Sequence, residues 1–200
     1  MKMSLKSTAS SASLLPGDRA PDFTLNSVLD NKEEQVKPFL LFAISEALDQ
    51  VSLSSLRGQH VLLMFYPVDF GYVTPTEFYS LAPLLPLLAD FDCSVLAIST
   101  EHISSQRNSQ ATPRSTLSHF SSTWENISHV KNILRSEAGL DGMGVRLASD
   151  PVGEVARLYG VYKAEENLAF SAFYLINPEG NIIAMEKCDF PVSITNVMHF

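Results

Sequence analysis

The stretch FYPVDFGYVTPTE, residues 65–77, decides the fold of this 200-residue chain. It leaves the apolar run HVLLMFY, residues 60–66, which is typical of a central strand covered on both faces in an α/β protein. After a short loop it reaches TPTE, residues 74–77, which predicts a helix N-terminus with Thr74 as N-cap and Glu77 completing a capping box. A loop that joins the carboxyl end of a central strand to a helix is where α/β proteins place their chemistry.

The predicted helix start offers unpaired backbone N–H groups and a partial positive charge, which would stabilise an anion such as a thiolate. Pro83 and Pro86 stand where this helix would continue. Because an interior proline costs roughly 3 kcal/mol and kinks or ends a helix, we expect the helix to run from Pro75 to about Ala82 and then to break.

A second helix is predicted over PVGEVARLY, residues 151–159. Asp150 is a suitable N-cap, and proline is favoured at the first helical position after it. The 3.6-residue period puts four apolar residues on one stripe: Val152, Val155, Ala156 and Tyr159. Gly160 predicts the C-terminal end of this helix.

The remaining patterns predict strands. Ala20–Phe23 leads into an extended segment, and Val95–Ile98 repeats the pattern of a buried strand. Residues 172–176 and 182–185 flank a turn at 177–180 and predict a β-hairpin. Strands separated by helices and followed by a hairpin indicate an α/β fold with a mixed sheet and helices on its faces.

Composition fits one globular domain and excludes two classes of partner. Apolar residues make up 46% of the chain, which is enough to bury a core. The formal net charge is −8, from 14 basic and 22 acidic residues, whereas proteins that bind nucleic acid or anionic membranes concentrate Lys and Arg. No run approaches the roughly 18 apolar residues that a membrane span requires. We therefore expect neither a nucleic-acid partner nor a membrane partner.

The two cysteines, Cys93 and Cys188, lie far apart and show no metal-ligand spacing. This usage suits a reducing compartment, so we expect a cytoplasmic protein without a metal or another cofactor. Residues 1–15 are rich in serine and are expected to be a disordered tail. The alternative is a mitochondrial presequence in this tail, although no arginine precedes Arg19.

Residues 65–77 closely resemble the active-site stretch of the typical two-cysteine peroxiredoxins of the AhpC/TSA type, enzymes that reduce hydroperoxides. The likeness covers most of the chain, in segments 20–23, 93–99, 147–150, 158–161 and 189–192. It implies a thioredoxin-like fold, a central mixed sheet flanked by helices, formed by residues 16–200. Two segments, near 36–50 and 105–117, have no counterpart in the family and are expected to be inserts. Since the chain reaches Phe200 soon after the last helix would begin, the C-terminal helix and arm are expected to be truncated.

The departures from the family concern its peroxide pocket. In the family, the cysteine that attacks the peroxide stands at the position of Thr74. A threonine or serine that contacts this sulfur stands at Gly71, and an arginine that stabilises the thiolate stands at Ser171. The proline that shields the pocket is kept as Pro67. The resemblance therefore implies a degenerate pocket with no intact catalytic residue.

A threonine cannot perform the chemistry that the resemblance assigns to this position. Peroxide reduction requires a thiolate that is oxidised to a sulfenic acid. An aliphatic hydroxyl is a far weaker acid, and its oxygen has no comparable oxidation ladder. Helix capping is the structural interpretation of Thr74 that we prefer.

Two functions therefore compete. The first is a peroxiredoxin-like pseudoenzyme with a binding, scaffold or holdase role, which forms a homodimer through an edge strand at Ile182–Glu186. The second is a thioredoxin-dependent thiol peroxidase in cell redox homeostasis, which acts through Cys93 or Cys188 and has thioredoxin as a partner. We interpret Cys93 as a small buried apolar residue and Cys188 as an exposed thiol, which favours the first function. A product of a duplicated or misannotated gene, without function, is a third alternative.

Overall fold

The computed structural model describes residues 14–29, 49–69, 74–106 and 145–188. Several predictions fall outside these ranges: most of the tail at 1–15, most of both inserts, Gly71, and the segment 189–200. The side chains of residues 74–76 and 79 are also not described.

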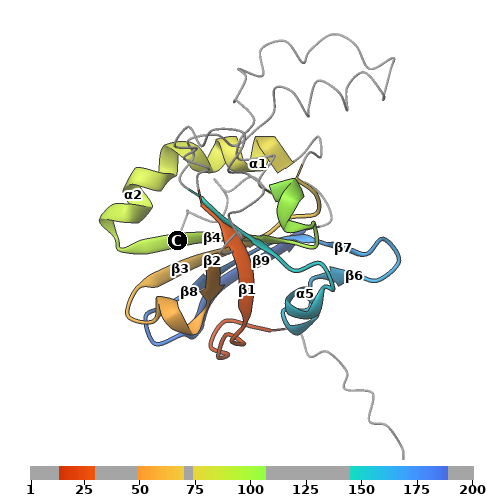
Figure 1. Cartoon of the computed structure of the whole chain (residues 1–200). Helices are drawn as coiled ribbons and strands as arrows, with labels where there is room; N and C mark the ends of the chain where they lie inside the picture. Colours follow the sequence, from red (N-terminus) through yellow and green to blue (C-terminus); the bar gives the residue numbers. More distant parts are fainter. Residues whose placement is uncertain (1–13, 30–48, 70–73, 107–144, 189–200) are drawn as a thin grey trace, which may run out of the picture.

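Seven strands form one mixed sheet in the order β2-β1-β5-β4-β3-β8-β9 (Figure 1). Their bounds are β1 Thr24–Val28, β2 Asp49–Ser52, β3 His60–Phe65, β4 Cys93–Ser99, β5 Arg146–Ser149, β8 Ser171–Ile176 and β9 Ile182–Cys188. The three central strands β3, β4 and β5 are parallel, and every other pairing in this sheet is antiparallel. A separate two-stranded sheet pairs β6 Tyr162–Lys163 with β7 Leu168–Ala169. The mixed sheet confirms the predicted architecture.

Helices cover both faces of the seven-stranded sheet (Figure 1). On one face lie α1 Thr74–Leu81, the 3₁₀ turn η2 Ala82–Leu84 and α2 Leu85–Asp90. The other face carries α5 Glu154–Leu158 and the short 3₁₀ turn η1 Ser54–Leu56. None of the helices in the described ranges combines the length and apolar character needed to cross a membrane.

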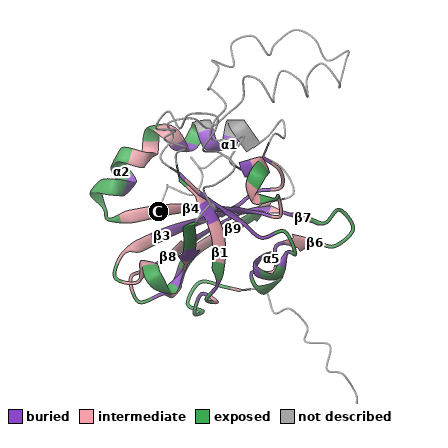
Figure 2. Ribbon diagram, in the orientation of Figure 1, coloured by how far each residue is buried: buried purple, intermediate pink, exposed green. Residues whose placement is uncertain are grey.

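Strand β3 confirms the prediction of a strand buried on both faces (Figure 2). Its side chains alternate between two core clusters, as the two-residue period of a strand requires. Leu62 and Met64 pack on the α1 face with Phe78 of α1. Leu63 and Phe65 pack on the α5 face. The core therefore has two layers, divided by the sheet.

The helix predicted at residues 151–159 is shorter than its pattern indicated. It occupies only Glu154–Leu158, because Gly153 has a φ of 71° and ends the preceding turn. Val152 belongs to that turn and is 62% exposed, so its place on the buried stripe was wrong. Asp150 still caps the helix, since its two carboxylate oxygens accept hydrogen bonds from the backbone N–H groups of Glu154 and Ala156 at 2.9 and 2.8 Å.

Two other predictions are confirmed. The first helix ends at Leu81, and η2 and α2 follow with Pro83 and Pro86 in their first turns. Strands β8 and β9 form the predicted hairpin, whose turn is closed by a 2.8 Å hydrogen bond from the Gly180 N–H to the Asn177 carbonyl. The antiparallel register of β8 with β3 places the start of β8 beside the end of β3.

Candidate functional site

The degenerate pocket predicted from the sequence lies at the carboxyl end of β3. Pro67 follows this strand after Tyr66 and is half-buried, and Thr74 is the first residue of α1. Gly71 lies outside the described residues. Glu77, the expected partner in the capping box, is buried in the first turn of α1. The helix therefore begins at Thr74, one residue before the predicted start at Pro75, and the capping contacts of Thr74 stay a prediction.

Strand β8 brings Ser171 to the same end of the sheet. In the antiparallel register Phe65 pairs with Ala172, so Ser171 lies beside Tyr66, where β3 passes into the Pro67 loop. Ser171 is only 7% exposed. The structure thus brings Pro67 and Ser171 to one end of the sheet, although they are separated by about a hundred positions. The side chain of Ser171 is uncharged, so it supplies no cation to stabilise an anion at this helix start.

Cys188 stands closer to this site than its sequence position indicated. It pairs with Ser171 across the β8–β9 hairpin. The side chain packs against the core cluster on the α1 face, the cluster that also contains Tyr66 and Phe173. Alternation along β8 places Ser171 on that face as well. The expectation of an exposed thiol was therefore wrong: Cys188 is half-buried and lies in register with the degenerate pocket.

Cys93 occupies the opposite end of the sheet. It is the first residue of β4 and pairs with His60, the first residue of β3. Seven residue steps lead from His60 to Pro67, which corresponds to about 23 Å along an extended chain. Burial raises the pKa of the Cys93 thiol, so less of it is thiolate at neutral pH. The thiol is half-buried and packs against the core, which supports its interpretation as a small apolar residue.

A buried polar cluster beneath the loop was not found from the sequence. The Tyr66 hydroxyl donates a 2.7 Å hydrogen bond to Oδ1 of Asp69, which is only 2% exposed. Nearby, Nε2 of Gln106 donates to Oγ of Ser99 at 3.1 Å and to the Ala148 carbonyl at 2.8 Å. These residues follow or end the parallel strands β3, β4 and β5, whose carboxyl ends meet at one edge. Polar residues just after buried strands were the signal that could have revealed this cluster.

The electrostatics of this cluster are set by burial. Burial raises the pKa of Asp69 to about 6, although the hydroxyls of Ser105 and Tyr66 lower it. The pKa of Tyr66 is raised well above its ordinary value by burial and by the neighbouring Asp69. Tyr66 therefore remains a hydrogen-bond donor at physiological pH. The carboxyl of Asp69, two residues after Pro67, therefore changes its charge close to neutrality.

The described ranges hold no group of three or more His, Cys, Asp or Glu side chains that could bind a metal ion. Within these ranges the residues described above offer hydroxyls, the buried carboxyls of Asp69 and Glu77, the Gln106 amide and the half-buried thiol of Cys188.

The comparisons with known proteins agree on one family. The model of the AhpC/TSA family matches residues 16–185. The thioredoxin peroxidase of Trypanosoma brucei rhodesiense is 31% identical over 143 residues, which span 72% of this chain and 61% of that protein. Peroxiredoxin-2 of Mus musculus is 28% identical over 176 residues, 88% of this chain and 71% of that protein. A mitochondrial thioredoxin-dependent peroxide reductase of Bos taurus is 30% identical over 74% of this chain and 50% of its own.

Solved structures show the same fold. The reduced 2-Cys peroxiredoxin of Plasmodium vivax has a TM-score of 0.68 at 19% identity, covering 91% of this chain and 77% of that one. AhpC of Mycobacterium tuberculosis has a TM-score of 0.67, also at 19% identity, over 93% and 90% of the two chains. The fold is thus thioredoxin-like and of the peroxiredoxin kind, as the sequence predicted.

Proposed function

Because this chain belongs to the AhpC/TSA family, we propose that it is a peroxiredoxin-like protein without peroxidase activity, which serves in binding, as a scaffold or as a holdase. The observation that carries the proposal is the residue at the start of α1, which is Thr74. A helix N-terminus can lower the pKa of a thiol into the neutral range, but it cannot make an alcohol a redox nucleophile.

The surroundings of Thr74 support the same conclusion. The resemblance assigns a cation to position 171, whereas this chain has the uncharged Ser171. Gly71 likewise lacks the hydroxyl that the family uses beside its sulfur. A pocket of Pro67, Gly71, Thr74 and Ser171 would accommodate a small polar molecule without reacting with it.

A thioredoxin-dependent thiol peroxidase remains the second candidate, and one observation favours Cys188 over Cys93 for it. Cys188 lies in register with Ser171 and on the α1 face, whereas Cys93 lies at the other end of β4. The Cys188 thiolate would attack one peroxide oxygen and break the O–O bond, which forms the sulfenic acid and releases hydroxide or an alkoxide that takes up a proton from solvent to become water or an alcohol. The resulting sulfenic acid would be returned to the thiol by two electrons from thioredoxin.

The test is peroxide-dependent NADPH oxidation by the purified full chain with thioredoxin and thioredoxin reductase. We expect a rate no higher than that of the mixture without the chain. An active AhpC/TSA protein in the same mixture serves as the positive control. Turnover that is lost in Cys188→Ser but kept in Cys93→Ser would overturn the proposal and establish the second candidate. Loss of turnover only in Cys93→Ser would overturn both our proposal and our preference for Cys188.

Suppression of the aggregation of a heat-denatured client protein tests the holdase role directly. If the chain neither slows client aggregation nor retains any partner on a column, its role is neither holdase nor scaffold.

We propose further that the chain forms a homodimer through Ile182–Glu186. These residues lie in β9, the outermost strand at one side of the sheet, and Ile183 is 46% exposed. An exposed apolar edge strand is a ready template for pairing with a second copy. Sedimentation velocity at micromolar concentration is expected to show a dimer.

The domain boundaries and the location in the cell are proposals of the same kind. We assign residues 16–200 to one thioredoxin-like domain with inserts near 36–50 and 105–117, and we place the protein in the cytoplasm. Imaging of the tagged full chain, beside a variant that lacks residues 1–15, tests the location. Mitochondrial signal that disappears with the deletion would establish the alternative, a presequence.

A further inference from the structure

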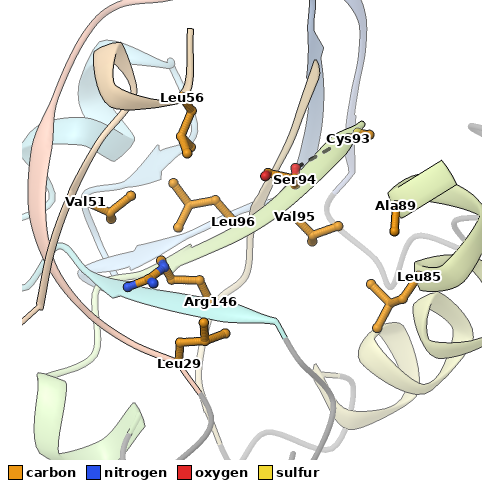
Figure 3. A pocket seen from close by; sticks show the side chains of 10 residues that line it. All are labelled: Leu29, Val51, Leu56, Leu85, Ala89, Cys93, Ser94, Val95, Leu96 and Arg146. Carbon is orange, nitrogen blue, oxygen red and sulfur yellow. Dashed lines mark hydrogen bonds between the residues drawn. The ribbon is translucent and has the colours of Figure 1, made fainter. Parts of the chain in front are cut away.

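Strands β4 and β5 start at different levels of the sheet, and a cavity lies in the space between them. β4 begins at Cys93, but β5 begins at Arg146, whose partner on β4 is Leu96. Residues 93–95 of β4 therefore have a strand partner on only one side within the described part of the chain. The cavity beside them has a volume of about 480 Å³ (Figure 3). Pockets of this size accommodate small organic molecules.

The walls of this cavity are mainly aliphatic. Val51 and Leu56 line one side, and Leu85 and Ala89 line the opposite side, where α2 lies (Figure 3). Val95 and Leu96 of β4 point to opposite faces between these two sides. An apolar ligand would transfer its own methylene groups from water to these aliphatic side chains, which favours binding.

Arg146 is the only residue with a formal charge among the described residues that line the cavity. Figure 3 shows its guanidinium beside Leu96, on the side of Val51. Nη1 donates a 3.0 Å hydrogen bond to Oγ of Ser27 and lies 3.6 Å from Oδ2 of Asp49. In the described part of the chain these contacts engage one guanidinium nitrogen, which leaves the other two able to donate.

The ion pair between Arg146 and Asp49 is weak. The Asp49 side chain is 71% exposed, and exposed ion pairs of this kind are worth little because water and salt screen them. A carboxylate that enters the cavity could therefore bind the free guanidinium donors. Guanidinium and carboxylate groups match in shape and form two parallel hydrogen bonds.

We propose that this cavity binds an amphipathic monocarboxylate, a molecule with a medium-length aliphatic chain whose carboxylate pairs with Arg146. A neutral apolar molecule would cover the guanidinium without satisfying its donors, which is costly. A phosphate dianion would meet one cation and a competing carboxylate, so it fits the charges less well. The proposal does not depend on the absence of peroxidase activity, since the cavity shares no residue with the pocket at Pro67, Gly71, Thr74 and Ser171.

Isothermal titration calorimetry of the full chain with octanoate tests the proposal, with 1-octanol as the neutral probe of the same chain length. We expect saturable binding of one octanoate per chain, at least tenfold tighter than binding of 1-octanol. A tenfold difference corresponds to about 1.4 kcal/mol, within the range for a hydrogen bond to a charged group. Equal affinities, or uptake of many molecules without saturation, would overturn the proposal.

Three variants identify the contact. Arg146→Gln is expected to weaken octanoate binding at least tenfold and to leave 1-octanol binding unchanged. Asp49→Asn is expected to tighten octanoate binding severalfold, because it removes the carboxylate that competes for the guanidinium. Arg157→Gln, at an exposed guanidinium that hydrogen-bonds the Val152 carbonyl, is the matched control and is expected to change neither affinity. If Arg146→Gln binds octanoate like the parent chain, the assignment is wrong.

Ala89→Trp keeps the proposal testable if Arg146→Gln fails to fold. Ala89 is an exposed residue of α2 that lines the cavity, so a larger side chain there occupies the cavity without altering the core. We expect both probes to bind at least tenfold more weakly while the thermal midpoint stays within a few degrees of the parent. Unchanged octanoate affinity in this variant would place the ligand elsewhere on the protein.

Discussion

The buried carboxyl of Asp69 is expected to destabilise the folded chain at neutral pH, and Asp69→Asn is expected to remove that cost. Burial raises the pKa of Asp69 from 3.8 to about 6. Between these two values the folded chain holds the proton more tightly than the unfolded chain, so the free energy of unfolding falls as the pH rises. A shift of about two pKa units corresponds to about 3 kcal/mol in the free energy of unfolding. The protonated Asp69 contributes this amount below the unfolded pKa, and the contribution is fully lost above about pH 6.

Asparagine keeps the geometry of the cluster while it removes the charge. Its side-chain oxygen can accept the hydrogen bond that the Tyr66 hydroxyl donates to Asp69. Because a hydrogen bond to a neutral acceptor is weaker than one to a carboxylate, the net gain is smaller than the full electrostatic cost. We expect Asp69→Asn to raise the free energy of unfolding at pH 7.5 by between about 1 and 3 kcal/mol.

Urea unfolding followed by far-ultraviolet circular dichroism measures this gain at several pH values from 7.5 to 4.5. Low protein concentration is needed in the lower half of this range, because the sequence pI is about 5.0. The advantage of Asp69→Asn over the parent is expected to shrink steadily as the pH falls. Asp90→Asn, at an exposed residue of α2, is the control that changes the net charge equally. A variant that is no more stable at pH 7.5, or an advantage that does not vary with pH, would refute the reasoning.

Three further predictions follow from the site, from α5 and from the sheet edge. Thr74→Cys alone is expected to add little peroxide turnover in the NADPH-coupled assay, and Thr74→Cys with Ser171→Arg is expected to add more, because only the pair supplies a cation for the thiolate. A rate from the single variant equal to that of an active AhpC/TSA protein would contradict this. In urea unfolding, Val155→Ala is expected to lower the free energy of unfolding by about 2 kcal/mol, because Val155 is buried. Val152→Ala is expected to change it by less than about 0.5 kcal/mol, because Val152 is exposed. Ile183→Lys is expected to shift sedimentation from dimer toward monomer, because lysine on an edge strand opposes pairing; an unchanged dimer would place the interface elsewhere.

Local patterns predicted those parts of the fold in which the short-range signal has one interpretation. The run at residues 60–66 is apolar from Val61 to Phe65 and ends before Pro67, which is typical of a strand buried on both faces. The start of α5 had two interpretations. Asp150 followed by proline suits a helix N-terminus and also a turn, and in both cases its carboxylate accepts backbone hydrogen bonds. The positive φ of Gly153 selects the turn, and a pattern of apolar residues does not contain that information.

The contacts around the site depend on tertiary structure that no local pattern contains. Gln106 reaches the Ala148 carbonyl 42 positions away, and Arg146 reaches Ser27 at a separation of 119. The chemical properties of glutamine and arginine do not predict which distant residues become their hydrogen-bond partners. The resemblance to a family could supply the four positions of the degenerate pocket, but Arg146 and its cavity were not among them.

The position of Cys188 shows how a one-residue shift in strand register determines which side chain lies opposite Ser171. Counting back from the Ile176–Ile182 pair at the turn would place Lys187 opposite Ser171. The register instead shifts by one residue between Leu175 and Ile176, so that Cys188 takes that place. Because side chains alternate between faces, this shift exchanges the two residues across the sheet. It places the Cys188 thiol at the core on the α1 face, and the Lys187 amine donates a 2.8 Å hydrogen bond to the Gly160 carbonyl.

Under the proposed function, the uncharged side chain at Ser171 and the alcohol at Thr74 are physically linked. The resemblance assigns a thiolate and an arginine to these two positions, which would stabilise one another. Once threonine replaces the thiol, an arginine at position 171 would be a cation without its anionic partner, at a site that is only 7% exposed. An uncompensated buried charge costs several kcal/mol, so the neutral Ser171 is the residue that this helix start tolerates without the thiolate. For the same reason we expect Thr74→Cys alone not to rebuild the pocket, because its thiolate would lack the cation that the resemblance assigns to position 171.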